Sequence, residues 1–113
     1  MANISRDFLR SSQRGDLEKL RELSTSHKIQ DWTVYRHEST GDTALHIAAR
    51  EGHLKIAKYL CYDWPYPAFK VDVANKDMKR PLHDASQFAR TDIVEFLIGQ
   101  GNIPSIYIHK RPL

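Results

Sequence analysis

The sequence predicts an all-α protein built from stacked pairs of short antiparallel helices. Two observations carry this prediction: a helix–turn–helix pattern in residues 41–60, and the return of that pattern at a constant offset along a chain of 113 residues. Two short helices cannot bury their apolar faces alone, so each pair needs a neighbouring copy to stack on.

The clearest unit is residues 41–60, GDTALHIAAREGHLKIAKYL. Thr43 can cap the first helix, because its hydroxyl accepts a bond from a free backbone N–H. Gly52 tolerates the left-handed conformation that ends a helix and starts a tight turn. Apolar residues then recur at helical spacing in a second helix, at Leu54, Ile56, Ala57 and Leu60.

The same pattern occurs on both sides of this unit. Gly52 follows Gly15 by 37 residues (52 − 15), and His83 follows His46 by the same distance (83 − 46). Ala89 occupies the place of a third turn glycine. Three units at one offset indicate a repeat architecture.

The connecting segments lack helical periodicity. Each contains a short run that favours extended structure, Trp32 to Tyr35 and Val71 to Val73, followed by turn-forming residues. We therefore expect a finger-like hairpin between successive helix pairs. The aromatic stretch WPYPAF at 64–69 is either a binding hot spot or a cover for the outer helices, and we favour the cover.

The motif TALHIAAREGHLKIAKYL resembles the ankyrin repeat, whose signature is T-P-L-H-x-A-A-x-x-G-H-x-x-(I/V)-V-x-x-L-L. PLHDASQFARTDIVEFL is a more divergent copy, and the resemblance covers about residues 5–102. It implies an ankyrin-repeat solenoid with β-hairpin-like fingers. Since the family period is about 33 residues, the excess should lie in the linkers.

The resemblance organises residues 1–113 as a single domain with an N-terminal capping repeat and two repeats. We expect a degenerate capping repeat at 3–30, repeat 1 at 38–63, an aromatic linker or finger at 64–74, and repeat 2 at 75–102. Residues 103–113 read as the start of a truncated further repeat or as a tail. The expectation is therefore a fragment of a longer array, whose uncapped apolar end risks self-association.

The second repeat departs from the signature at three positions, one at a helix cap and two in turns. Arg80 stands where a threonine is expected and cannot supply the hydroxyl cap, at a cost of about 1 kcal/mol. Met78 replaces a finger-turn glycine, and Ala89 replaces the glycine between the helices. A side chain at either position is costly if φ is positive there.

Composition excludes several classes of protein. The 17 basic and 14 acidic residues are interleaved, so a formal charge of +3 does not indicate nucleic-acid binding. The lone Cys61 cannot form an intrachain disulfide and suits a reducing compartment. Because the sequence shows neither a signal peptide nor an apolar run near 20 residues, we expect no membrane span and a cytoplasmic or nuclear location.

No catalytic, metal or cofactor pattern is present among the six histidines, the cysteine and the glycine turns. The resemblance implies that His46 and His83 tie neighbouring loops together and that His53 has a packing or hydrogen-bonding role. Cys61 lacks a defined base and is expected to be semi-buried and inert. The chain is therefore not expected to be an enzyme.

The resemblance implies protein binding through finger tips and inner helices, which form a concave face. Phe88 beside Met78 is the candidate apolar anchor, unless Phe88 packs under the finger. The candidate binding residues are His37, Glu38, Asp42, Arg50, Glu51, Lys76, Met78, Lys79, Arg80, Gln87 and Phe88.

Two alternatives remain at this stage. The basic finger residues Lys76, Lys79 and Arg80 could bind nucleic acid in a salt-sensitive way, or so short an array could be inactive. The segments GDTALHIAAREGH and NKDMKRPLHDAS are also similar to a family member associated with alanyl-tRNA synthetase. That closer resemblance implies an adaptor in translation quality control.

Overall fold

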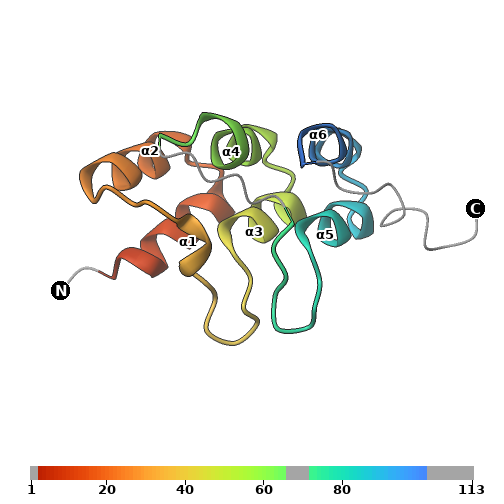
Figure 1. The fold of residues 1–113 in the computed structure, drawn as a ribbon, viewed down its shortest axis with the longest axis horizontal. Helices are drawn as coiled ribbons and strands as arrows, with labels where there is room; N and C mark the ends of the chain where they lie inside the picture. Colours follow the sequence, from red (N-terminus) through yellow and green to blue (C-terminus); the bar gives the residue numbers. More distant parts are fainter. Residues whose placement is uncertain (1–2, 66–71, 102–113) are drawn as a thin grey trace, which may run out of the picture.

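The computed structural model describes residues 3–65 and 72–101. These ranges form two layers of helices, with α1, α3 and α5 side by side and α2, α4 and α6 above them (Figure 1). They contain no strand, which confirms the all-α class. The elements are α1 (Ile4–Arg14), α2 (Leu17–Ser26), the short helical turn η1 (Trp32–Val34), α3 (Ala44–Glu51), α4 (Leu54–Lys58), the turn η2 (Tyr59–Asp63), α5 (Pro81–Gln87) and α6 (Thr91–Gly101).

Each helix pair turns through one residue in the left-handed conformation. The φ angle is +73° at Gly15, +82° at Gly52 and +57° at Ala89. This confirms the predicted offset of the three units and the predicted replacement of a turn glycine by Ala89. The glycines also permit close packing between units, because a Cβ on Gly15 would lie 2.8 Å from the His53 ring, and one on Gly52 would lie 3.0 Å from the Arg90 guanidinium.

The side chains that pass over these turns link successive units. His53 Nε2 donates to the Gln13 carbonyl at 2.9 Å, and Arg90 Nε donates to the Arg50 carbonyl at 3.1 Å. Donors and acceptors both follow the 37-residue offset. The third unit thus keeps the bond between units although its sequence has changed from histidine to arginine.

The start of α3 ties two repeats together. Thr43 Oγ1 accepts the His46 backbone N–H at 3.4 Å, while His46 Nδ1 accepts the Thr43 N–H at 3.1 Å. His46 Nε2 then donates to the Lys79 carbonyl at 2.8 Å, which confirms its expected role. At α5, His83 Nδ1 accepts the Arg80 N–H at 2.9 Å, but Arg80 has no hydroxyl to complete the reciprocal pair.

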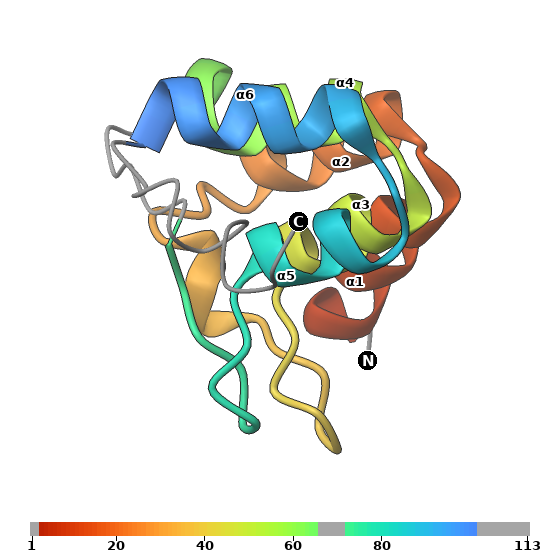
Figure 2. The same cartoon turned by 90° about the vertical axis from the view of Figure 1, so that its right-hand side faces the viewer.

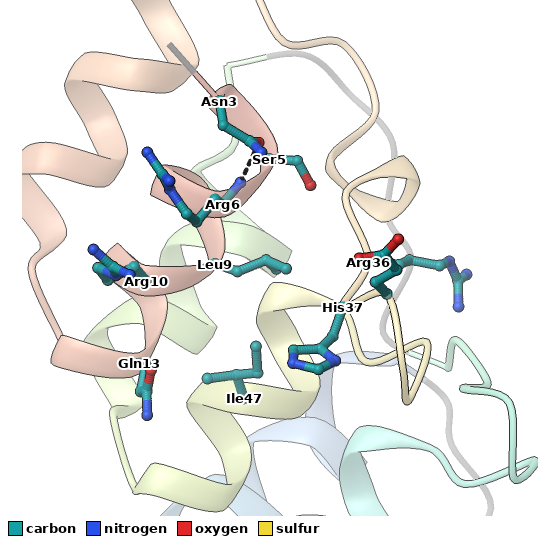
Figure 3. Close-up of a pocket in the computed structure, with 10 residues that line it drawn as sticks. Asn3, Ser5, Arg6, Leu9, Arg10, Gln13, Arg36, His37 and Ile47 are labelled. Atoms are coloured by element: carbon teal, nitrogen blue, oxygen red, sulfur yellow. Dashed lines mark hydrogen bonds between the residues drawn. The ribbon is translucent and has the colours of Figure 1, made fainter.

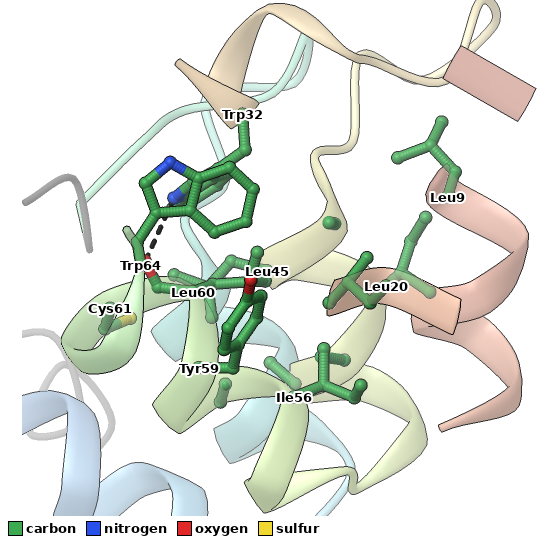
Figure 4. Packing of buried hydrophobic residues seen from close by; sticks show 14 of the residues in the cluster. Leu9, Leu20, Trp32, Leu45, Ile56, Tyr59, Leu60, Cys61 and Trp64 are labelled. Atoms are coloured by element: carbon green, nitrogen blue, oxygen red, sulfur yellow. Dashed lines mark hydrogen bonds between the residues drawn. The ribbon is translucent and has the colours of Figure 1, made fainter. Parts of the chain in front are cut away.

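A continuous apolar core fills the space between the two layers (Figure 4). Cys61 is buried in it, and burial raises the pKa of its thiol to about 12. The thiol is therefore protonated at neutral pH and a poor nucleophile. The largest fully buried aliphatic side chains are Leu20, Leu45, Ile56, Leu60, Leu82, Ile93 and Leu97.

The predicted extended run from Trp32 to Tyr35 is wrong, because the helical turn η1 occupies its first three residues. Asp31 Oδ1 starts the turn by accepting the Thr33 backbone N–H at 2.9 Å and the Thr33 hydroxyl at 2.6 Å. The turn directs the Trp32 indole into the core, where its N–H donates to the Leu60 carbonyl at 3.0 Å (Figure 4).

The aromatic stretch begins with a structural residue, as predicted. Trp64 is buried, lies edge-on to Phe8 and Tyr59 at centroid distances of 6.0 and 5.4 Å, and donates its indole N–H to the Gln30 carbonyl at 3.3 Å. The remaining predictions for residues 66–71 and 103–113, including self-association through the chain end, lie outside the described residues.

Two hairpin-like fingers project from the inner layer (Figure 2). We call residues 36–42 finger 1 and residues 73–79 finger 2. In finger 1, Gly41 N donates to the His37 carbonyl at 2.8 Å. In finger 2, Met78 N donates to the Asn75 carbonyl at 3.0 Å, and Met78 has a φ of +61°.

The fingers are held against each other. Lys76 N donates to the Thr40 carbonyl at 3.0 Å, and Lys76 Nζ donates to the Glu38 carbonyl at 2.6 Å. A Cβ on Gly41 would lie 2.9 Å from Lys76 N, so this glycine allows the close approach. The two fingers therefore form one braced surface.

Candidate interaction surface

The fingers and the inner helices share the side of the molecule that faces away from α2, α4 and α6 (Figure 2). Most of the binding residues predicted from sequence are exposed. Those classed as exposed are His37, Glu38, Glu51, Lys76, Met78, Lys79, Gln87 and Phe88.

The other three predicted residues are held by neighbours. Asp42 is buried, its Oδ1 accepts Asn75 Nδ2 at 2.8 Å, and its Oδ2 pairs with Arg50 Nη1 at 3.2 Å. Burial alone raises the pKa of Asp42, but hydrogen bonds, led by the one from Asn75, outweigh it and lower the pKa. Arg80 Nε pairs with Asp72 Oδ1 at 2.8 Å. These contacts stabilise the bases of the fingers.

The two apolar candidates are exposed but do not form one anchor. The relative exposure is 66% for Met78 and 44% for Phe88, so Phe88 is not packed under the finger. Met78 lies in the turn of finger 2, whereas Phe88 follows the last residue of α5. With a rise of about 1.5 Å per residue, the helix alone separates them by roughly 10 Å.

Asp84 is a buried carboxylate whose importance the sequence did not reveal. It follows Ile47 by the repeat offset (84 − 47 = 37), so an acid occupies a position that is apolar in α3. Only 6% of the residue is exposed, and its Oδ2 has no hydrogen-bond partner. Burial raises the pKa of Asp84 to about 6.

Asp42, His46 and Asp84 offer ligand atoms within 4.8 Å of one another, a spacing that could hold a metal ion. The hydrogen bonds argue against one. His46 Nδ1 accepts the Thr43 N–H and Nε2 donates to the Lys79 carbonyl, so the ring has no free lone pair for an ion. We interpret the cluster as a polar contact between α3 and α5.

A cavity of about 640 Å³ lies between α1 and finger 1 (Figure 3). Leu9 and Ile47 form its floor, Arg6 and Arg10 flank it on α1, and His37 borders it on the finger. Of these, only His37 is among the residues predicted from sequence. The α1 residues were overlooked because the first unit lacks the repeat signature and was interpreted as a cap.

Stacked helix pairs with projecting fingers and an accessible inner-helix side define a solenoid repeat protein. Residues 8–107 match ankyrin repeats in three copies, and the chain belongs to the ankyrin-repeat family. Ankyrin repeats are protein–protein interaction modules. Within the part of the chain that the structure describes, no helix combines the length and apolar composition needed to cross a membrane.

Curated relatives include much longer proteins. The chain is 38% identical over 60 residues to Protein ACCELERATED CELL DEATH 6 of Arabidopsis thaliana, a match of 53% of this chain and 8% of that protein. It is 33% identical over 93 residues to the liver isoform of mitochondrial glutaminase from Mus musculus and from Rattus norvegicus, a match of 80% of this chain and 14% of each glutaminase. Such small shares do not transfer the activity of those proteins to this chain.

Proposed function

We propose that this chain is a non-enzymatic adaptor that binds a partner protein through its fingers and inner helices. The main support is the exposure of Met78 and Phe88 at two places on the inner-helix side. Methionine and aromatic side chains are enriched in the cores of protein interfaces. The eight exposed candidates would contact the partner, and Asp42, Arg50 and Arg80 would hold the fingers in position.

The backbone at Met78 adds to this support. A φ of +61° is unfavourable for a residue with a side chain, and a glycine stands at the matching place in finger 1, Gly41. Burial of the side chain does not compensate, since Met78 is exposed. Strained residues concentrate at functional sites, so a binding role for the side chain accounts for its presence.

A comparison of three tagged proteins tests the proposal: wild type, a Met78→Ala, Phe88→Ala double variant, and a Tyr62→Ala control. Tyr62 is 64% exposed and lies in η2, outside the proposed surface. We expect the double variant to lose proteins that wild type and the control both retain from a cell lysate. Identical sets of retained proteins for all three would contradict the proposal.

A narrower role rests on sequence resemblance alone. Residues 41–53 and 75–86 are similar to ankyrin repeat domain-containing protein 16, so we propose alanyl-tRNA synthetase as a partner, in the cytoplasm or the nucleus. The buried Cys61 thiol is compatible with these reducing compartments. Titration with purified alanyl-tRNA synthetase tests this partner. Failure to bind would remove the narrower role and leave the general one intact.

A further inference from the structure

The cavity between α1 and finger 1, which we call the α1 groove, combines an apolar floor with a cationic wall on α1. Leu9 and Ile47 present the edges of buried side chains, and Leu9 points across the groove toward Ile47 and His37 (Figure 3). Arg6 and Arg10 stand four residues apart on α1, so they lie on the same side of the helix.

Both arginines are accessible. The Arg6 side chain is 60% exposed and only loosely paired with Asp7, at 3.7 Å, and Arg10 is exposed as well. Ion pairs between exposed groups at such distances contribute little to stability. Arg6 can therefore exchange this contact for an incoming carboxylate, and the exposed Arg10 guanidinium can bind one as well.

The third arginine at the groove is structural. Arg36 Nε donates to the Thr33 carbonyl at 3.0 Å, and Arg36 Nη1 donates to the carbonyls of Gly41 and Ala74 at 3.1 and 2.7 Å. These bonds fix the base of finger 1 and its position relative to finger 2. They give the groove a rigid second wall.

His37 supplies a hydrogen-bond donor on that wall. Its Nδ1 accepts the backbone N–H groups of Ser39 and Thr40 at 3.2 and 3.4 Å, so the proton of the neutral ring is on Nε2. Glu38 is the one acidic residue among those that line the groove in the described chain. Positive charge thus exceeds negative charge among the residues that line the groove.

We propose that the α1 groove binds an extended acidic segment of a partner protein, with an apolar side chain placed on Leu9 and Ile47. Alternate side chains of an extended chain point in opposite directions. One apolar residue can therefore face the floor while its acidic neighbours reach Arg6 and Arg10 in charge-assisted bonds. This proposal rests on the proposed protein-binding function and names the chemistry of the segment that is bound.

Two features favour a peptide over nucleic acid. The floor is aliphatic and offers no aromatic surface on which bases could stack. The accessible guanidinium groups line one wall only, and Glu38 borders the other. A phosphate backbone in the groove would therefore lie near both positive and negative charge.

The test measures fluorescence anisotropy of a labelled peptide in which two leucines are flanked by glutamates. Two further probes are the same peptide with lysines in place of the glutamates, and a single-stranded RNA. The Arg6→Glu, Arg10→Glu variant is compared with a Lys55→Glu, Lys58→Glu control, which makes the same charge change at exposed positions of α4 in the outer layer. Arg6→Gln, Arg10→Gln serves as a milder second variant, and thermal melts confirm that all are folded.

We expect the acidic peptide to bind wild type and the α4 control equally, and the α1 variant at least about tenfold more weakly, with the lysine peptide and the RNA not bound. Binding should also weaken as salt is raised. Equal loss in the α1 variant and the control, tighter binding of RNA than of peptide, or no binding of the acidic peptide would each overturn the proposal.

The two proposals fail in different ways. If the acidic peptide does not bind but Met78→Ala, Phe88→Ala still loses partners from lysate, only the assignment of the α1 groove is wrong. If the peptide binds through Arg6 and Arg10 but the double variant keeps every partner, the finger 2 surface is wrong and the groove remains.

Discussion

The second and third units of this protein have the same backbone design but different chemistry. In the α3–α4 unit, both left-handed positions are glycines, Gly41 and Gly52, and the helix is capped by a threonine hydroxyl. In the α5–α6 unit the same left-handed positions carry side chains, at Met78 and Ala89. The repeat backbone is therefore specified by stacking between units as much as by local residue preference.

The two units also differ in how closely their residues follow the repeat signature. The α3–α4 unit is close to the family signature and supplies the bonds that hold its neighbours, through His46 and His53. The α5–α6 unit contains a strained fingertip, a strained turn and the buried acid Asp84. We expect substitutions toward the signature to stabilise the third unit and substitutions away from it to damage the second.

The largest effect is expected for His46→Ala in the well-formed unit. The substitution removes a fully buried ring and leaves the Thr43 N–H and the Lys79 carbonyl without their partner. Unfolding free energy should fall by about 3 kcal/mol, as measured by urea denaturation. A loss below about 1 kcal/mol would mean that His46 does not link the two units.

The next effect is a gain, from Asp84→Ile, which copies Ile47 into the third unit. The folded state raises the pKa of Asp84 from 3.8 to about 6, so it holds the proton more tightly than the unfolded chain. Wild-type stability attributable to this group is therefore highest below about pH 4, falls as pH rises to about 6, and stays low above it. At pH 7 the variant should be about 2 kcal/mol more stable.

Denaturation at pH 4 and pH 7 measures this dependence. The advantage of Asp84→Ile over wild type should shrink at the lower pH, because the Asp84 carboxyl is then protonated in the folded wild type. An advantage that is the same at both pH values would show that the effect comes from packing and not from the buried charge.

A smaller effect comes from exchanging the two turn residues. Gly52→Ala should destabilise by about 1–2 kcal/mol, because φ is +82° and the new Cβ would meet the Arg90 guanidinium. Ala89→Gly should stabilise by about 0.5–1 kcal/mol, since it relieves a φ of +57°. Thermal melts of the two variants check the opposite signs, and a shift in the same direction for both would refute the comparison.

The smallest expected effect, from Met78→Gly, links strain to binding. Relief of the positive φ should raise unfolding free energy by about 0.5–1 kcal/mol. The same variant should bind partner proteins less well, since it removes an exposed apolar side chain. If Met78→Gly becomes more stable and still binds every partner, the strained backbone at Met78 has no role in binding.

The sequence predicted the parts of the fold that depend on local pattern. The 37-residue offset, the Thr43 cap and the three turn positions can be read from residue type and spacing. It did not predict η1, because the local Asp31 cap was overlooked and because the contact that holds the Trp32 indole is with the Leu60 carbonyl, 28 residues away. Tertiary contacts of this kind have no local signature.

The candidate surface was predicted less completely than the fold. Exposed fingertip residues such as Met78 follow from the repeat register, but the burial of Asp42 depends on Asn75, 33 residues later. In the sequence, Asp84 looks like an ordinary polar residue of a helix. Its burial becomes apparent only in the folded structure. The α1 groove requires α1 and finger 1 to meet, although their sequences show no sign of contact.

Site-specific photocrosslinking tests the central claim, that partners bind on the side of the fingers and inner helices. A photoreactive phenylalanine analogue is placed at Met78 in one protein and at Tyr62 in another, because these side chains are similarly exposed, at 66% and 64%. The account predicts crosslinked partner proteins from position 78 and none above background from position 62. Equal crosslinking at the two positions, or crosslinking from position 62 alone, would contradict it.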